Sequence, residues 1–290
     1  MKQSRSSKYT SSARAAYAQK SKGPSGPARR HSNPVNLPPR EPRVELPRNQ
    51  RVVTGFHALR EALAVRPKAI EKAWFKQGWE SSADLKDLHQ AMVAKGIVIE
   101  EKSSNLLDKV ISSNQGAAAF LSKGPELDWN LLAEAKNSTV LVLDGLEDPH
   151  NLGAILRTSW LIGVDAVLAP EDRSASLTAT VHKVACGGAE HVPVERVVSF
   201  HNPIEELKKN GFWVFGLSHE GTQSIYDLKI PEKVVWCIGS EDKGLRTTTE
   251  KLCDELVFLP QASAAASYNA SVATAMALAE TRRQRSHQKD

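Results

Sequence analysis

The chain has 290 residues, of which 41% are hydrophobic, enough for a core in one large or two ordinary domains. Its net charge of +5 is unevenly distributed: residues 1–51 hold 12 Lys and Arg against two Glu, and the rest holds 26 Lys and Arg against 31 Asp and Glu. The composition excludes a wholly disordered chain, and three cysteines without CxxC spacing indicate neither a disulfide framework nor a cysteine-based zinc site.

The first 50 residues combine Ser, Lys, Arg, Gly and Pro with single apolar residues. Such a segment cannot bury enough apolar surface to offset the entropy of ordering, so residues 1–50 are predicted to be a disordered basic tail. Its charge suits an arm that neutralises RNA phosphates, and a solubilising extension is the alternative. No apolar block has signal-peptide length, and no run reaches the roughly 18 to 20 apolar residues of a membrane span. We therefore expect a soluble cytoplasmic protein with no membrane partner.

Residues 52–122 are predicted to form a small α/β domain. The expected elements are a helix at Gly55–Val65, a strand at Ala69–Phe75, a helix at Ser81–Lys95, and short strands at Ile97–Ile99 and Gly116–Leu121. Gly96 is expected to end the second helix. The segment 123–138, with its Gly, Pro and mixed polar residues, is predicted to be a linker.

A second domain over 139–290 is predicted to be α/β with a mostly parallel sheet. It opens with TVLVLDGL (139–146), an unbroken apolar run typical of a strand covered on both faces. Further strands are expected at Val164–Ala169, Phe212–Leu217, Val234–Ile238 and Glu255–Leu259, separated by helical or loop segments. Asn269–Gln284 is expected to be a closing amphipathic helix with basic residues in its last turns.

Common enzyme signatures are absent, since the sequence has no GxxxxGK[ST], GxGxxG, HExxH or GxSxG. Polar clusters remain at the predicted C-terminal ends of strands, where open parallel sheets bind ligands. The first is DGLEDPHNLGAILR (144–157), with a helix starting near Asn151. Asn151 is either a functional amide or only a helix cap, and Arg157 is either functional or a surface arginine.

Two further clusters follow later strands. In IGSEDKGLR (238–246), Gly239 allows the backbone to approach a ligand closely, and Glu241 is either functional or solvated in an ordinary β-to-α turn. In LPQASAAASYNASVA (259–273), small side chains leave room for a ligand before the last helix. The alternative is that Ser267 or Asn269 is only the cap of that helix.

In this order and at these spacings, the clusters resemble the three motifs of the SpoU/TrmH family of RNA ribose 2′-O-methyltransferases, in the SPOUT superfamily. NLGAILRTS resembles motif one, IGSEDKGLR motif two and SYNASVATAMALAE motif three. GFHALREAL and DRSASLTATVHKVACGGAEHVPV further resemble the branch that methylates a guanosine of 23S rRNA. The resemblance covers residues from about 52 to 285. It implies an L30e-like substrate-binding domain at 52–122 and an α/β trefoil-knot methyltransferase domain at 139–290.

The resemblance also assigns residues to roles. It places the catalytic positions at Asn151, Arg157, Glu241, Ser267 and Asn269. It places the largely backbone contacts to the methyl donor, S-adenosyl-L-methionine, at Gly216, Gly239, Leu259 and Tyr268. The chain departs from the family pattern at Tyr268, where leucine is usual, and at Asn114, where histidine is common.

The implied reaction is attack of a ribose 2′-hydroxyl on the methyl group of the donor, helped mainly by holding the reacting atoms in line. A guanidinium is a poor base, so we expect Arg157 to bind the target phosphate and to lower the pKa of the hydroxyl. The proton acceptor is left open among water, phosphate and Glu241. No metal is expected, because the nine histidines show no ligand spacing.

The expected partners are RNA and a second copy of the chain, since members of the family work as homodimers through the knot domain. Ribosomal RNA is favoured as substrate by the L30e-like domain and the DRSASLTAT segment. Two alternatives stay open: a tRNA ribose methyltransferase of the same family, and a non-catalytic RNA-binding or ribosome-assembly factor that keeps the fold.

Overall fold

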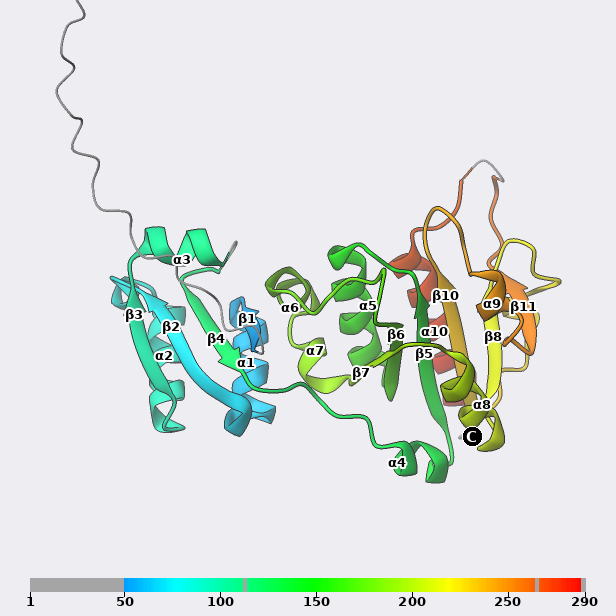
Figure 1. Ribbon diagram of the computed structural model, residues 1–290, viewed down its shortest axis with the longest axis horizontal. Helices are drawn as coiled ribbons and strands as arrows, with labels where there is room; N and C mark the ends of the chain where they lie inside the picture. The colour runs from blue at the N-terminus through cyan, green and yellow to red at the C-terminus, as the bar shows by residue number, and fades with distance from the viewer. Residues whose placement is uncertain (1–49, 112–113, 264–265, 288–290) are drawn as a thin grey trace, which may run out of the picture. The chain divides into compact units, whose positions relative to one another are not determined.

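Figure 1 presents the computed structural model, which describes residues 50–111, 114–263 and 266–287. The basic tail expected at 1–50 lies outside the described residues, except for Gln50. From residue 51 onward the described chain forms two sheets, one of four strands and one of seven.

The four-stranded sheet is built from the first part of the chain. Its strands are β1 (Arg51–Thr54), β2 (Ile70–Lys76), β3 (Val98–Lys102) and β4 (Ala117–Leu121), with helices α1 (Phe56–Val65), α2 (Ala83–Ala94) and α3 (Ser104–Val110) and 3-10 helices η1 (Pro67–Ala69) and η2 (Trp79–Ser81). The order is β1-β4-β2-β3, in which β4 is antiparallel to β1 and β2, and β3 is parallel to β2. Ser82 and Ser103 cap α2 and α3 through their side chains.

The seven-stranded sheet has the order β7-β6-β5-β10-β8-β11-β9, and each of its pairings is parallel. Its strands are β5 (Ser138–Asp144), β6 (Ala166–Pro170), β7 (Val194–Val197), β8 (Trp213–Leu217), β9 (Gln223–Ser224), β10 (Lys233–Gly239) and β11 (Glu255–Phe258). Its helices are α5 (Pro149–Ile162), α6 (Ala179–Ala185), α7 (Gly188–His191), α8 (His201–Lys209), α9 (Thr247–Glu250) and α10 (Ala270–His287), with 3-10 helix η3 (Ile225–Asp227). The mostly parallel α/β sheet predicted for this half is therefore confirmed, and the trefoil knot stays a prediction.

Both faces of this sheet are covered, which explains why its strands read as unbroken apolar runs. Leu141 and Leu143 of β5 belong to the core formed with α5 and α10, whereas Val140 and Val142 belong to the core formed with α8. Alternate side chains of one strand thus enter opposite layers. In Figure 1, β5, β10 and β8 lie side by side in the middle of this sheet.

Local boundaries differ from the expected ones in three places. The predicted linker segment 123–138 contains helix α4 (Trp129–Glu134), which Asp128 caps and whose Leu132 packs into the core with α8. The first strand of the large sheet already begins at Ser138. The helix expected to start near Asn151 starts at Pro149 and has Asp148 as its cap.

Candidate active site

Asn151 lies in the first turn of α5, but it does not cap this helix. The Asp148 carboxylate does so by accepting the backbone N–H of His150 at 2.9 Å, with Pro149 at the first helical position. The cap interpretation of Asn151 is therefore wrong, and its amide is free for another contact. Asn151 is buried, and its Nδ2 donates a hydrogen bond to Oε1 of Glu241.

Glu241 stands on a tight loop that leaves the end of β10. The loop is closed by two backbone hydrogen bonds of 3.0 Å between Ser240 and Gly244. Gly239 permits this closure, because a Cβ there would lie 2.1 Å from the carbonyl carbon of Gly244. The loop thus holds the Glu241 carboxylate at the carboxyl end of the sheet, where the register pairs Gly239 with Asp144 of β5.

Asn269 completes this group from the third cluster. Its Nδ2 donates to the same Glu241 Oε1 at 2.6 Å, while its Oδ1 accepts the backbone N–H of Ser271 at 2.9 Å at the start of α10. Asn269 therefore both caps α10 and contacts Glu241. The three predicted clusters meet at one carboxylate oxygen, and we call Asn151, Glu241 and Asn269 the Glu241 cluster.

The structure does not bring Arg157 and Ser267 into hydrogen-bond contact with the Glu241 cluster. Arg157 is exposed two turns further along α5, and its Nη1 donates to Sγ of Cys186 at 3.5 Å. Cys186 is half-buried at the C-terminal end of α6. Ser267 is exposed and makes no hydrogen bond within the described residues.

The predicted methyl-donor positions gather at the ends of three neighbouring strands. Gly216 lies in β8 opposite Cys237 of β10, Gly239 ends β10, and Leu259 directly follows β11. Tyr268 is 38% exposed, and its hydroxyl donates to the Pro260 carbonyl at 3.1 Å. The described residues from 260 to 263 and from 266 to 269 are all exposed, so a ligand can reach this loop.

One charged pair at this edge was missed by the sequence reasoning. Asp144 ends β5 with its side chain fully buried, and its carboxylate accepts the Arg246 backbone N–H at 2.8 Å and also the Arg246 guanidinium. The pair ties the start of the loop before α5 to the end of the Glu241 loop. A single acidic residue at the end of an apolar strand was the available signal. Within the described residues no cluster of His, Cys, Asp and Glu could hold a metal ion.

The described helices include none that is long and apolar enough to cross a lipid bilayer. A parallel α/β sheet with polar side chains gathered at the carboxyl ends of its strands defines the class of ligand-binding α/β enzymes. Residues 138–279 match the SpoU rRNA Methylase family, and residues 52–126 match the domain described as RNA 2′-O ribose methyltransferase substrate binding.

Curated relatives match along most of their length. The chain is 37% identical over 242 residues to the 23S rRNA (guanosine-2′-O-)-methyltransferase RlmB of Neisseria meningitidis, covering 82% of this chain and 96% of the relative. It is 36% identical over 241 residues to RlmB of Escherichia coli K12, covering 81% and 99%. The protein belongs to the SpoU rRNA methylase family, and the resemblance inferred from the motifs is confirmed.

Solved structures share the fold. The SpoU methyltransferase AviRb from Streptomyces viridochromogenes matches with a TM-score of 0.71 at 20% identity, covering 83% of this chain and 91% of that one. AviRb in complex with AdoMet matches with a TM-score of 0.69 at 21% identity, covering 82% and 92%. At these identities the likenesses show the fold.

Proposed function

We propose that this protein transfers the methyl group of S-adenosyl-L-methionine to the 2′-hydroxyl of a guanosine in 23S rRNA. The observation that carries the proposal is the Glu241 cluster, in which side chains from all three family motifs meet. The RlmB relatives support the substrate, and the AdoMet complex of AviRb supports the donor.

The carboxyl edge of the large sheet fits a nucleoside donor. Gly239 ends β10 and Leu259 directly follows β11, the two strands on either side of β8, and the loop that carries Tyr268 is accessible. We propose that backbone groups of Gly216, Gly239, Leu259 and Tyr268 hold the donor. Gly216 also leaves room for its neighbours, because a Cβ there would lie 2.6 to 2.9 Å from side chains of Leu245, Cys253 and Leu256. S-adenosylmethionine, when bound, supplies the electrophilic methyl group.

The remaining roles belong to polar side chains of this chain. Two amides bind Oε1 of Glu241, so Asn151 and Asn269 are held in fixed positions while Oε2 accepts no hydrogen bond from the described residues. We propose that Oε2 takes up a proton or binds the RNA, with Ser267 lining the same loop. Arg157 is exposed and keeps most of its guanidinium donors for a phosphate of the RNA.

We further propose the assembly that this function needs. Residues 52–122 bind the RNA, residues 139–290 bind the donor and carry the reaction, and 123–138 connects them. In this proposal the protein acts in the cytoplasm as a homodimer that forms through the knot domain. The basic residues of 1–50 add contacts to RNA phosphates. Deleting 1–50 is then expected to weaken RNA binding and to flatten its salt dependence while donor binding is kept.

Ribose methylation mapped across 23S rRNA and tRNA, in cells with and without the gene, tests the proposal directly. The expected result is one guanosine that loses its 2′-O-methyl group without the gene. In vitro, Arg157→Ala is expected to keep the fold and donor binding while losing most transfer. Calorimetry that shows no S-adenosylmethionine binding, even with RNA present, would contradict catalysis, and a modified tRNA would contradict the substrate.

A further inference from the structure

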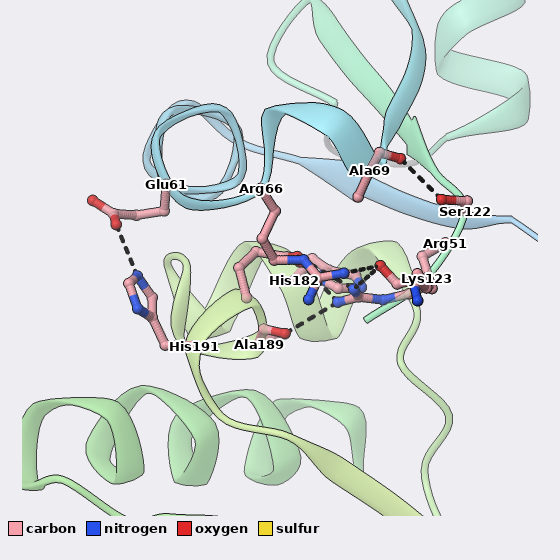
Figure 2. Close-up of polar contacts among 10 residues, drawn as sticks. Arg51, Glu61, Arg66, Ala69, Ser122, Lys123, His182, Ala189 and His191 are labelled. Carbon is pink, nitrogen blue, oxygen red and sulfur yellow. Dashed lines mark hydrogen bonds and ion pairs between the residues drawn. The ribbon is translucent and has the colours of Figure 1, made fainter. Parts of the chain in front are cut away.

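A second carboxylate, Glu190 in α7, joins the two sheets. Arg51 of β1 binds it with both terminal nitrogens, Nη2 to Oε1 at 2.7 Å and Nη1 to Oε2 at 3.2 Å. Arg66, which follows α1, brings Nε within 3.7 Å of Oε2, and His182 of α6 places Nδ1 3.3 Å from Oε1. Figure 2 shows Arg51 and Arg66 reaching from the small sheet toward His182 and Ala189. We call Glu190, Arg51, Arg66 and His182 the Glu190 cluster.

Burial makes this cluster a strong connection. The Glu190 side chain is fully buried, and those of Arg51 and Arg66 are 13% and 19% exposed. Burial alone would raise the pKa of Glu190, but the hydrogen bond from His182 and the charge of Arg51 outweigh it and lower the pKa. A buried carboxylate without its charged partners strongly destabilises the fold, so Arg51 and Arg66 favour the contact between Glu190 and the small sheet.

The short helix α7 contacts both the small sheet and the helix that carries the candidate catalytic residues. Beside Glu190, His191 lies 2.9 Å from Glu61 of α1 and stacks on Trp160 of α5 with ring centroids 4.2 Å apart. Gly188 packs so tightly on α5 that a Cβ there would lie 2.5 Å from the Leu156 carbonyl oxygen. A position imposed on α7 is therefore transmitted to α5 at Leu156, next to Arg157.

We propose that Glu190 is a positioning residue: through Arg51 and Arg66 it fixes the small sheet against α5, so that RNA held by residues 52–122 presents its ribose to the Glu241 cluster. This proposal rests on the proposed function. Without the Glu190 cluster, residues 52–122 and the large sheet can move independently. Binding an RNA that contacts both must then also supply the free energy of orienting them. Loss of the cluster therefore raises the KM for an RNA that contacts both parts, and leaves the binding of the methyl donor unchanged.

The chain offers a matched pair of variants. Arg66→Gln removes one arginine from the Glu190 cluster while Arg51 and His182 still contact Glu190. Arg60→Gln removes an arginine of α1 whose one ion-pair partner among the described residues is exposed Asp84, at 3.5 Å, so it lowers the net charge equally without touching the cluster. Arg66→Gln is expected to raise the KM for a long 23S rRNA fragment about fivefold, with kcat and the Kd for S-adenosylmethionine within about twofold of wild type. Arg60→Gln is expected to stay within about twofold in all three.

A double-mutant cycle separates positioning from direct RNA contact. If Arg66 acts through Glu190, the effects of Arg66→Gln and Glu190→Gln on the KM for RNA are strongly non-additive. Additive effects, or equal values for Arg66→Gln and Arg60→Gln, would overturn the proposal. If Glu190→Gln does not fold, the KM values for RNA of Arg66→Gln and Arg60→Gln are enough to test the proposal.

Proteolysis gives a reading that needs neither RNA nor methyl transfer. The Lys123 carbonyl accepts Arg51 Nη1 at 3.2 Å and Arg66 Nη2 at 2.5 Å, so the segment after β4 is held by the same arginines. In Glu190→Gln, trypsin is expected to cut after Lys123 several-fold faster than in the wild type, while cutting after exposed Lys136 is unchanged. Equal rates at Lys123 would show that Glu190 does not hold the regions together. A wild-type protein that fails to methylate RNA would refute the proposed function and leave this reading intact.

Discussion

Glu241 and Glu190 each join segments that lie far apart in the sequence, and their partners differ in kind. Glu241 stands on an exposed loop and receives two neutral amides on one oxygen. Glu190 is fully buried and receives a two-nitrogen contact from Arg51, with Arg66 and His182 beside it. Neutral donors hold a carboxylate in place without cancelling its charge, whereas arginines do both.

The difference separates a carboxylate that is available for the reaction, Glu241, from one that can only stabilise the structure, Glu190. The charge of Glu241 stays available to a proton or to an RNA group, because Oε2 has no partner within the described residues. The charge of Glu190 is neutralised by its arginines, and its side chain is fully buried. Variants of the first cluster should change catalysis more than stability, and variants of the second should change stability first.

The largest effect is expected for Glu190→Ala. Removing this carboxylate leaves Arg51 and Arg66 partly buried without their counter-charge, which costs about 3 to 5 kcal/mol of unfolding free energy. Urea denaturation followed by circular dichroism measures this loss. Asp84→Ala, which breaks an exposed ion pair, serves as the control and should cost less than about 1 kcal/mol. A loss for Glu190→Ala as small as that of the control would refute the distinction.

Glu241→Ala is expected to give the opposite profile. Without the shared oxygen, Asn151 and Asn269 lose their common partner, and kcat should fall about 100-fold, equivalent to about 2.7 kcal/mol of activation free energy. Unfolding free energy should change by less than about 1 kcal/mol, because Glu241 is exposed. Glu241→Gln keeps an acceptor oxygen for the amides, so any defect that it retains reports the charge itself. Equal kcat for wild type and Glu241→Gln would mean that only positioning matters.

The secondary-structure elements differ in how well the sequence predicts them. The long apolar strands and the closing helix were predicted, because a buried strand or an amphipathic helix leaves a periodic pattern. Strands β1, β7 and β9 were not predicted, since RVVT, VERV and QS contain no apolar run longer than two residues, whereas the equally short β11 reads ELVF. Helix α4 was missed because its six residues depend on the cap at Asp128 and on the packing of Leu132.

The two clusters differ in the same way. Asn151, Glu241 and Asn269 were found through the motifs of the family, although 90 residues separate the first two and no spacing rule relates them. Their catalytic roles stay predictions. Arg51 and Glu190 are 139 residues apart. Glu190 lies in the segment DRSASLTATVHKVACGGAEHVPV, but the resemblance gives neither residue a role, so only the folded chain reveals the pair. Long-range pairs of ordinary charged residues leave no periodic signal in a single sequence.

Asp144→Asn tests an intermediate case. Asp144 is as buried as Glu190, but its partner Arg246 is 41% exposed and can be rehydrated. The expected loss of unfolding free energy is therefore smaller, about 2 kcal/mol. Since Arg246 ends the Glu241 loop, kcat should fall as well, which distinguishes this variant from both clusters. Urea denaturation and single-turnover rates on the same preparation check it, and unchanged turnover would show that the pair does not position Glu241.

The smallest effect concerns the third donor on Glu190. Burial lowers the pKa of His182, although the hydrogen bond with Glu190 opposes this shift. Its Nε2 is buried without a partner within the described residues, which suits a neutral ring with its proton on Nδ1. As the pH falls below the ordinary value of 6.5, the unfolded histidine gains a proton and the folded one does not. Protonation therefore favours the unfolded state, and the free energy of unfolding falls.

The difference between wild type and His182→Gln isolates this contribution, because the other titrating groups largely cancel. Between pH 7.5 and 5.5 the unfolding free energy of the wild type should fall more steeply than that of the variant, by at most about 1.4 kcal/mol per pH unit, the limit for one proton. Glu190, whose pKa is also lowered, adds loss in the same direction only below its ordinary value of 4.5. A steeper fall in the variant would mean that His182 is charged in the folded protein. Glu190 would then be held by three cations, and the contrast with the neutral donors of Glu241 would be greater still.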